Sequence, residues 1–196
     1  MRPRSEILVK VADGLYEPRE DTYLLLDRAE VRRGERVLEV GTGPGLIALH
    51  AAAEGARVTA SDIDPRAARC ARENAVRNGL ELSTVVSDLL SGLRGPFDLV
   101  MFNPPYLPTE DGLSPDRRET GGPEGDELSM RFVKELPRVL TPGGRAYLVT
   151  SSLQPEGRLA AMAADRFGVE VAGATKHFFE EISVLTLALR PGATRD

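Results

Sequence analysis

The sequence predicts an α/β protein with a doubly wound, seven-stranded, mostly parallel sheet that ends in an antiparallel C-terminal hairpin. Short apolar runs alternate with helical patterns from about residue 22 to the end of the chain, which is typical of a parallel sheet covered by helices. A glycine-rich turn follows the first apolar run. The last two apolar runs are joined without a helix, which indicates an antiparallel pair at one sheet edge.

Start and stop signals delimit the elements of the N-terminal half. Glu20 and Asp21 place negative charge where the first helix begins, and Gly55 ends the second helix. Asp64-Pro65 is an N-cap followed by proline at the first helical position, and Asn78-Gly79 ends that third helix. The expected helices are Thr22–Ala29, Leu46–Glu54 and Pro65–Arg77, and the expected strands are Arg36–Val40, Val58–Ser61, Leu82–Ser87 and Phe97–Phe102.

The C-terminal half continues the alternation of helices and strands and then ends in two strands with no helix between them. Pro142-Gly143-Gly144 predicts a turn between a helix and the fifth strand. The expected helices here are Leu128–Leu140 and Arg158–Phe167, and the expected strands are Arg145–Thr150, Val169–Ala174 and Ile182–Leu189.

Length and composition predict one globular domain over residues 1–196, with an N-terminal segment and first helix in 1–30 and the core in 31–196. No apolar stretch is long enough to span a bilayer, and no apolar core follows the basic N-terminus. The single cysteine, Cys70, excludes an intramolecular disulfide and a cysteine zinc cluster. We therefore expect a cytoplasmic location, with no membrane contact and no metal.

Negative charge is concentrated in one segment. Thr109 to Glu127 carries seven acids and two bases, 2 − 7 = −5, which equals the formal net charge of the whole chain. A nucleic-acid binder usually presents a basic face. The segment is either a solvated loop or an electrostatic match for a basic partner.

The first strand runs into a turn that fits a cationic cofactor. It reads Glu39-Val40-Gly41-Thr42-Gly43-Pro44-Gly45, and its glycines allow the backbone to turn tightly and approach a ligand. A dinucleotide turn would place a third glycine where Leu46 stands. The Glu39 carboxylate would repel a pyrophosphate but attract a cation. S-adenosylmethionine carries an ammonium and a sulfonium and no phosphate, so it is the predicted cofactor.

Two further acids end the next two strands. Asp62 lies 62 − 41 = 21 residues after Gly41, the place where a carboxylate accepts both ribose hydroxyl protons. After the third strand, Asp88 is expected to accept from an adenine amino group while Leu89 covers the ring. In open α/β sheets such strand ends share one crevice.

The fourth strand leads directly into Asn103-Pro104-Pro105-Tyr106, whose prolines fix the backbone. An amide nitrogen is a poor nucleophile because its lone pair is delocalised. The Asn103 side-chain oxygen and the Pro104 carbonyl are expected to accept its two N–H bonds and stabilise the positive charge of methyl transfer. Tyr106 would offer an aromatic face to a planar substrate group.

The sequence resembles the HemK-like protein glutamine methyltransferases, and most closely their compact eukaryotic and archaeal type. The most specific match is Tyr16-Glu17-Pro18-Arg19-Glu20-Asp21-Thr22. Further matches are Leu38–Gly43, Asp62, Ser87–Leu89, Phe102–Tyr106, the glycines Gly121, Gly122 and Gly125, and Ile182–Leu185.

This resemblance implies a class I, Rossmann-like methyltransferase that modifies the glutamine of a Gly-Gly-Gln loop in a class-1 translation release factor. It also implies a small zinc-binding activator subunit at the edge of the third strand, Thr84-Val85-Val86. The catalytic candidates are Asn103, Pro104 and Tyr106. The cofactor-binding candidates are Tyr16, Thr22, Glu39, Gly41, Thr42, Gly43, Asp62, Ile63, Asp88, Leu89 and Asn103.

Other functions remain open at this stage. An RNA or DNA methyltransferase acting on adenine or guanine amino groups would use Asn-Pro-Pro-Tyr equally well, with Tyr106 stacking on an extruded base. A non-catalytic binding module with this fold would fail to bind S-adenosylhomocysteine. A nicotinamide oxidoreductase fits less well, because of Leu46 and Glu39.

Overall fold

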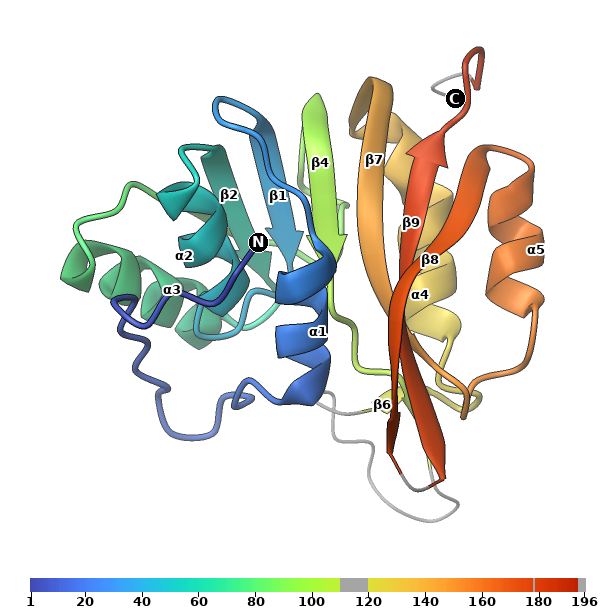
Figure 1. Cartoon of the computed structure of the whole chain (residues 1–196), viewed down its shortest axis with the longest axis horizontal. Coiled ribbons are helices and arrows are strands. Elements are labelled where there is room, and N and C mark those ends of the chain that lie inside the picture. Colours follow the sequence, from blue (N-terminus) through green and yellow to red (C-terminus); the bar gives the residue numbers. More distant parts are fainter. Residues whose placement is uncertain (110–119, 178, 194–196) are drawn as a thin grey trace.

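The central sheet of the protein is seen in a computed structural model that describes residues 1–109, 120–177 and 179–193. Neighbouring strands from β3 to β7 pair in parallel, whereas β9 is antiparallel to both β7 and β8. The predicted fold class is confirmed (Figure 1). In spatial order the strands are β3 (Ser83–Val86), β2 (Arg57–Asp62), β1 (Arg36–Val40), β4 (Phe97–Phe102), β7 (Leu140–Ser151), β9 (Glu180–Leu189) and β8 (Phe167–His177).

Helices cover both faces of this sheet. On one face, α1 (Glu20–Arg28) and α2 (Leu46–Ala53) bury Leu25 and Ile47 in one apolar cluster with β4 residue Met101. On the other face, α4 (Glu127–Glu135) and α5 (Arg158–Ala164) bury Phe132 and Leu159 in a second cluster. Figure 1 shows α1 in front of the sheet and α4 behind it. Full burial of an aromatic side chain such as Phe132 contributes about 1.5–3 kcal/mol.

The order of the strands places the ligand site. β1 lies between β2 and β4, so the chain leaves β1 in one direction for β2 and later returns to its other side as β4. This is the topological switch point, where the crevice at the carboxyl ends of the strands opens. The predicted turn after β1 and the Asn103 segment after β4 are therefore neighbours.

The expected helix Leu128–Leu140 is shorter than predicted. The α-helix ends at Glu135, and a 3-10 turn, Leu136–Arg138, follows it. Pro137 explains the change, because proline lacks the N–H that an α-helical hydrogen bond needs. The expected turn at residues 142–144 lies inside β7: Leu140 pairs with Phe97, and the register then shifts so that Leu99 pairs with Arg145.

Other element boundaries also differ from the prediction. α5 ends at Ala164, and Phe167 begins β8 instead of ending the helix. A short parallel pair, β5 (Leu107–Pro108) and β6 (Thr120–Gly122), was not predicted. Segments of two or three residues carry no periodicity, so only tertiary structure reveals them. No helix in the described ranges combines the length and apolarity needed to cross a membrane.

The segment before α1 lies against α3 (Pro65–Arg77), as Figure 1 shows. The Asn78 side chain accepts from the Leu8 backbone N–H at 2.8 Å and donates to the Leu8 carbonyl at 2.8 Å. Asn74 makes the same pair of bonds with Lys10, at 3.1 and 2.8 Å. These amides replace the missing partners of an extended backbone.

Candidate active site

The turn between β1 and α2 depends on its glycines. Gly41, Gly43 and Gly45 have φ values of 64°, 53° and 91°, a region that favours glycine. At Gly45 an added Cβ would lie 2.9 Å from the Cβ of Ala71, so α3 also approaches too closely for a side chain. The turn thus brings bare backbone to the crevice, as a ligand cradle requires.

Glu39, at the end of β1, is a buried carboxyl group. It is 5% exposed, and its Oε2 accepts from Thr42 Oγ1 at 2.6 Å and from the Ala48 N–H at 2.9 Å. Burial raises the pKa of Glu39 to about 8, against the lowering effect of these two donors. A cation bound beside Glu39 would oppose that burial effect and favour the carboxylate.

Asp62, at the end of β2, closes the other side of the glycine turn. Its Oδ2 accepts from the Gly43 N–H at 2.9 Å, and its Oδ1 accepts from the Asp64 N–H at 2.9 Å. Burial raises the pKa of Asp62 above its usual value, although the backbone donors lower it. Ile63 follows with a side chain that is 53% exposed. The pair offers acceptors for hydroxyl groups and an apolar surface for a flat ring.

Asp88 and Leu89 follow β3. Arg131 of α4 donates to Asp88 Oδ2 at 3.0 Å, a partner that the sequence did not predict. Leu89 has a φ of 48°, which is uncommon for a residue with a Cβ. Ser87 Oγ donates to the Leu89 carbonyl at 3.1 Å and supports this conformation. Backbone strain of this kind costs on the order of 1–3 kcal/mol and gathers at functional sites.

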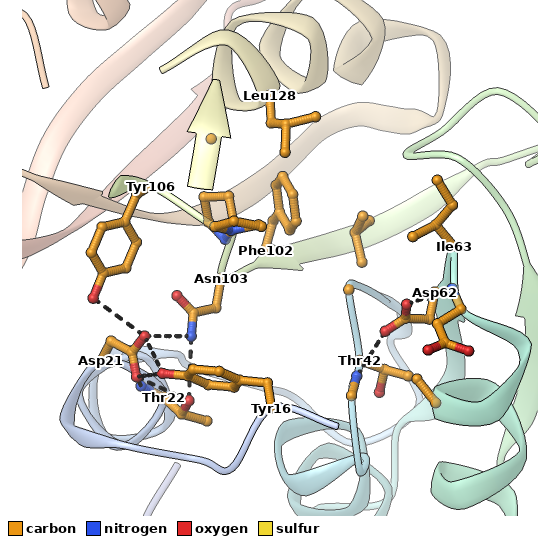
Figure 2. A pocket seen from close by; sticks show the side chains of 18 of the residues that line it. Tyr16, Asp21, Thr22, Thr42, Asp62, Ile63, Phe102, Asn103, Tyr106 and Leu128 are labelled. Carbon is orange, nitrogen blue, oxygen red and sulfur yellow. Dashed lines mark hydrogen bonds between the residues drawn. The ribbon is translucent and has the colours of Figure 1, made fainter. Parts of the chain in front are cut away.

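The Asn103 side chain, after β4, belongs to a cluster around Asp21 of α1 (Figure 2). Asn103 Nδ2 donates to Asp21 Oδ2 at 3.1 Å and to Thr22 Oγ1 at 3.3 Å. The Tyr16 hydroxyl lies 2.8 Å from each Asp21 oxygen, and the Tyr106 hydroxyl lies 3.4 Å from Oδ2. Asn103 Oδ1 is buried and has no hydrogen-bond partner among the described residues.

All of the predicted site residues line a single cleft of about 1600 Å³. A site for one small ligand is usually about 300–1,000 Å³, so this cleft has room for a cofactor and for part of a second substrate. Sequence reasoning did not select several charged residues that also line the cleft, among them Asp21, Glu127, Arg131 and Glu180. What each predicted residue binds stays a prediction.

The residues present fit the predicted cofactor. Buried Glu39 is suited to a cation, and the Gly41–Gly45 turn exposes backbone. The Asn103 oxygen, which has no hydrogen-bond partner among residues 1–109, 120–177 and 179–193, can accept from a ligand in the same cleft. With the doubly wound sheet, these features define a class I S-adenosylmethionine-dependent methyltransferase. Residues 19–179 match the methyltransferase small domain family, and the chain belongs to this family and to its HemK-like members.

Curated relatives with related activities align over most of the chain. A putative protein N5-glutamine methyltransferase of Methanocaldococcus jannaschii is 38% identical over 91% of this chain and 94% of its own length. A release factor glutamine methyltransferase of Deinococcus radiodurans is 44% identical over 67% of this chain and 52% of its own length.

Solved structures share the fold. A chain of the E. cuniculi Mtq2-Trm112 complex, responsible for methylation of the termination factor eRF1, aligns with a TM-score of 0.73 and 28% identity. The alignment covers 89% of this chain and 98% of that one. A methyltransferase of Pyrococcus furiosus aligns with a TM-score of 0.68 at 23% identity, which supports the fold alone.

Proposed function

We propose that this methyltransferase transfers a methyl group to the side-chain amide nitrogen (N5) of the glutamine in a Gly-Gly-Gln loop of a translation release factor. The observation that carries the proposal is Asn103 Oδ1, a buried acceptor without a partner among the described residues. It adjoins Pro104 in the cleft. A buried acceptor is costly when unpaired, so this site favours a ligand that donates N–H bonds.

Two acceptors suit an amide NH₂ in particular. When Asn103 Oδ1 and the Pro104 carbonyl accept its two N–H bonds, they fix the plane of the amide and draw electron density toward its nitrogen. Both oxygens also stabilise the positive charge that grows on nitrogen as the cofactor supplies its methyl group. The amide proton becomes acidic only after the new bond forms, so no strong base is required.

The names of the related proteins support a protein substrate. Those from M. jannaschii and D. radiodurans are both named for glutamine methylation, at 38% and 44% identity. Glu127 and Glu180 add two more carboxylates to the cleft lining, which suits a loop rich in N–H groups and basic side chains better than a phosphate backbone. Most of the acidic segment from Thr109 to Glu127 lies outside the described residues.

The direct test uses the class-1 release factor of the source organism and labelled S-adenosylmethionine. Mass spectrometry is expected to locate one added methyl group on the glutamine of the Gly-Gly-Gln loop. A release factor with that glutamine replaced by glutamate is the matched control, because it keeps the shape but lacks the NH₂. Label that appears in RNA of a host lysate, and that ribonuclease removes, would instead support the nucleic-acid alternative.

We also propose that the exposed edge strand β3 binds a small activator subunit. β3 ends the sheet, and its residues Val85 and Val86 are 36% and 55% exposed. An apolar, unpaired edge invites pairing with another chain. The related solved structure is a complex of Mtq2 with Trm112. The partner we expect here is the small zinc-binding activator subunit that the sequence resemblance implies.

Substituting Val86→Glu is expected to weaken binding of such a subunit at least tenfold, because a charge would be buried in the interface. Val171→Glu is the matched control: Val171 is 64% exposed on β8, the opposite edge of the same sheet. Affinity is measured by calorimetry with the purified Trm112-type protein of the source organism. Equal affinities for the two variants would place the partner elsewhere.

A further inference from the structure

The side-chain amide of Asn103 has an oxygen that accepts hydrogen bonds and an NH₂ group that donates them. Only the oxygen suits the reaction. If its NH₂ faced the cleft, it would meet the donor NH₂ of the substrate, and the two would repel. If its oxygen faces the cleft, it accepts a substrate N–H. The two orientations of the Asn103 amide, related by a half-turn, have nearly the same shape. A neighbouring group must therefore favour the one in which the oxygen faces the cleft.

The neighbour that makes the selection is Asp21. A carboxylate can only accept hydrogen bonds, and Asp21 Oδ2 lies 3.1 Å from Asn103 Nδ2. Rotating the amide by half a turn would place an oxygen against that carboxylate oxygen and lose the bond. Figure 2 shows dashed lines from the Asn103 nitrogen to Asp21 and to Thr22, and none from the Asn103 oxygen.

Asp21 is itself held in place by burial and by several hydrogen bonds, so it can fix the orientation of the Asn103 amide. It is 4% exposed, and besides Asn103 it accepts from the Thr22 N–H at 2.6 Å, the Thr22 hydroxyl at 3.2 Å and the Tyr16 hydroxyl. Burial, followed by the charge of Asp21, raises the pKa of Tyr16 and of Tyr106 well above the usual range. Both tyrosines therefore remain protonated donors toward Asp21.

We propose that Asp21 is a positioning residue that fixes the orientation of the Asn103 amide, so that Asn103 Oδ1 faces the NH₂ group of the substrate. The inference rests on the proposed function, because it presupposes a substrate nitrogen that donates hydrogen bonds. Asp21 acts through Asn103 and need not touch the substrate. It joins the N-terminal segment to the end of β4, which explains why a charged residue is buried there.

The first test replaces Asp21 by asparagine, which keeps the shape but adds an NH₂ that competes with that of Asn103. We expect kcat to fall about 100-fold, as for loss of one oriented polar group in an active site, and the Kd for S-adenosylhomocysteine to change less than threefold. Asp27→Asn is the matched control on the same helix, because Asp27 is half exposed, forms an ion pair with neighbouring Arg28 and does not line the cleft. It should leave kcat unchanged.

A polarity swap separates orientation from general structural support. Asn103→Asp alone sets two carboxylates against each other and is expected to be nearly inactive. In the double variant Asp21→Asn/Asn103→Asp, the new amide at position 21 donates and the new carboxylate still turns an acceptor toward the substrate. The double variant is expected to exceed Asn103→Asp at least tenfold in kcat. If the losses of kcat in Asp21→Asn and in Asn103→Asp simply multiply in the double variant, the two residues act independently and the proposal is overturned.

Nuclear magnetic resonance of the free enzyme gives a readout that needs no substrate. The side-chain NH₂ signals of Asn103, identified by their loss in Asn103→Ala, should shift and exchange faster with solvent in Asp21→Asn. Unchanged signals would overturn the role of Asp21 even if glutamine methylation is confirmed. Conversely, the wild-type enzyme could leave the release factor unmethylated while the Asn103 signals still shift in Asp21→Asn. That outcome would exclude the proposed substrate but support the orienting role of Asp21.

Discussion

Asn103→Ala is expected to lower kcat for methyl transfer by about 100- to 1,000-fold, the range seen when one oriented group that stabilises developing charge is removed. The variant loses the buried Oδ1 acceptor and leaves the Asp21 carboxylate without one of its donors. The cofactor contacts expected from the β1 and β2 strand ends remain. Single-turnover kinetics with the release factor and calorimetry with S-adenosylhomocysteine measure the two effects separately.

Asn78→Ala is the matched control for this prediction. Asn78 also holds backbone groups through its side-chain amide, but at the C-terminal end of α3, where its partner is Leu8. It should retain wild-type kcat. An Asn103→Ala enzyme with more than a tenth of wild-type turnover would remove Asn103 from the mechanism, and an equally large loss of cofactor affinity would make it a binding residue only.

The fold could be predicted because its signals are local and repeated. Short apolar runs of the β1 and β4 type are buried on both faces in a parallel sheet, and turn or cap residues separate them from the helices. The errors occur where one residue overrides a pattern. Pro137 ends an α-helix within an amphipathic stretch, and residues 141–144 form an irregularity in β7 instead of a turn before it.

The cleft itself was predictable for the same reason, since each polar candidate follows a strand and parallel strands end at one edge. The role of Asp21 was not. In the sequence, Glu20 and Asp21 look equivalent, as two acids that favour the start of a helix. In the structure Glu20 is exposed, whereas Asp21 is buried among two tyrosines and Asn103. Only the tertiary contact between α1 and the end of β4 distinguishes them.

Binding of S-adenosylmethionine is expected to release a proton from Glu39 at neutral pH. The pKa of Glu39 is raised to about 8 in the protein without a ligand, so the group is mostly protonated at pH 7. A cation beside it favours the carboxylate and lowers that pKa. Below pH 8 the bound state therefore holds fewer protons, and affinity should rise with pH by up to about tenfold per unit before levelling off near pH 8.

The stability of the ligand-free protein should show the opposite trend. Between the ordinary pKa of a glutamate, 4.5, and the folded value of about 8, the folded protein binds a proton at Glu39 that the unfolded chain does not. Unfolding then releases a proton, so the Glu39 contribution is present at low pH and is lost as the pH rises through 8. Thermal denaturation from pH 6 to 8.5, with and without the cofactor, measures both trends.

Glu39→Gln separates the charge of Glu39 from its structural bonds. A glutamine oxygen can still accept from Thr42 Oγ1 and the Ala48 N–H, which lie 2.6 and 2.9 Å from Glu39 Oε2, but it cannot titrate. Cofactor affinity at pH 8 should fall at least tenfold, and both the pH slope and the released proton, seen as a buffer-dependent enthalpy in calorimetry, should vanish. A slope that persists in Glu39→Gln would assign the proton to another group, with Asp62 the first to consider because burial raises its pKa as well.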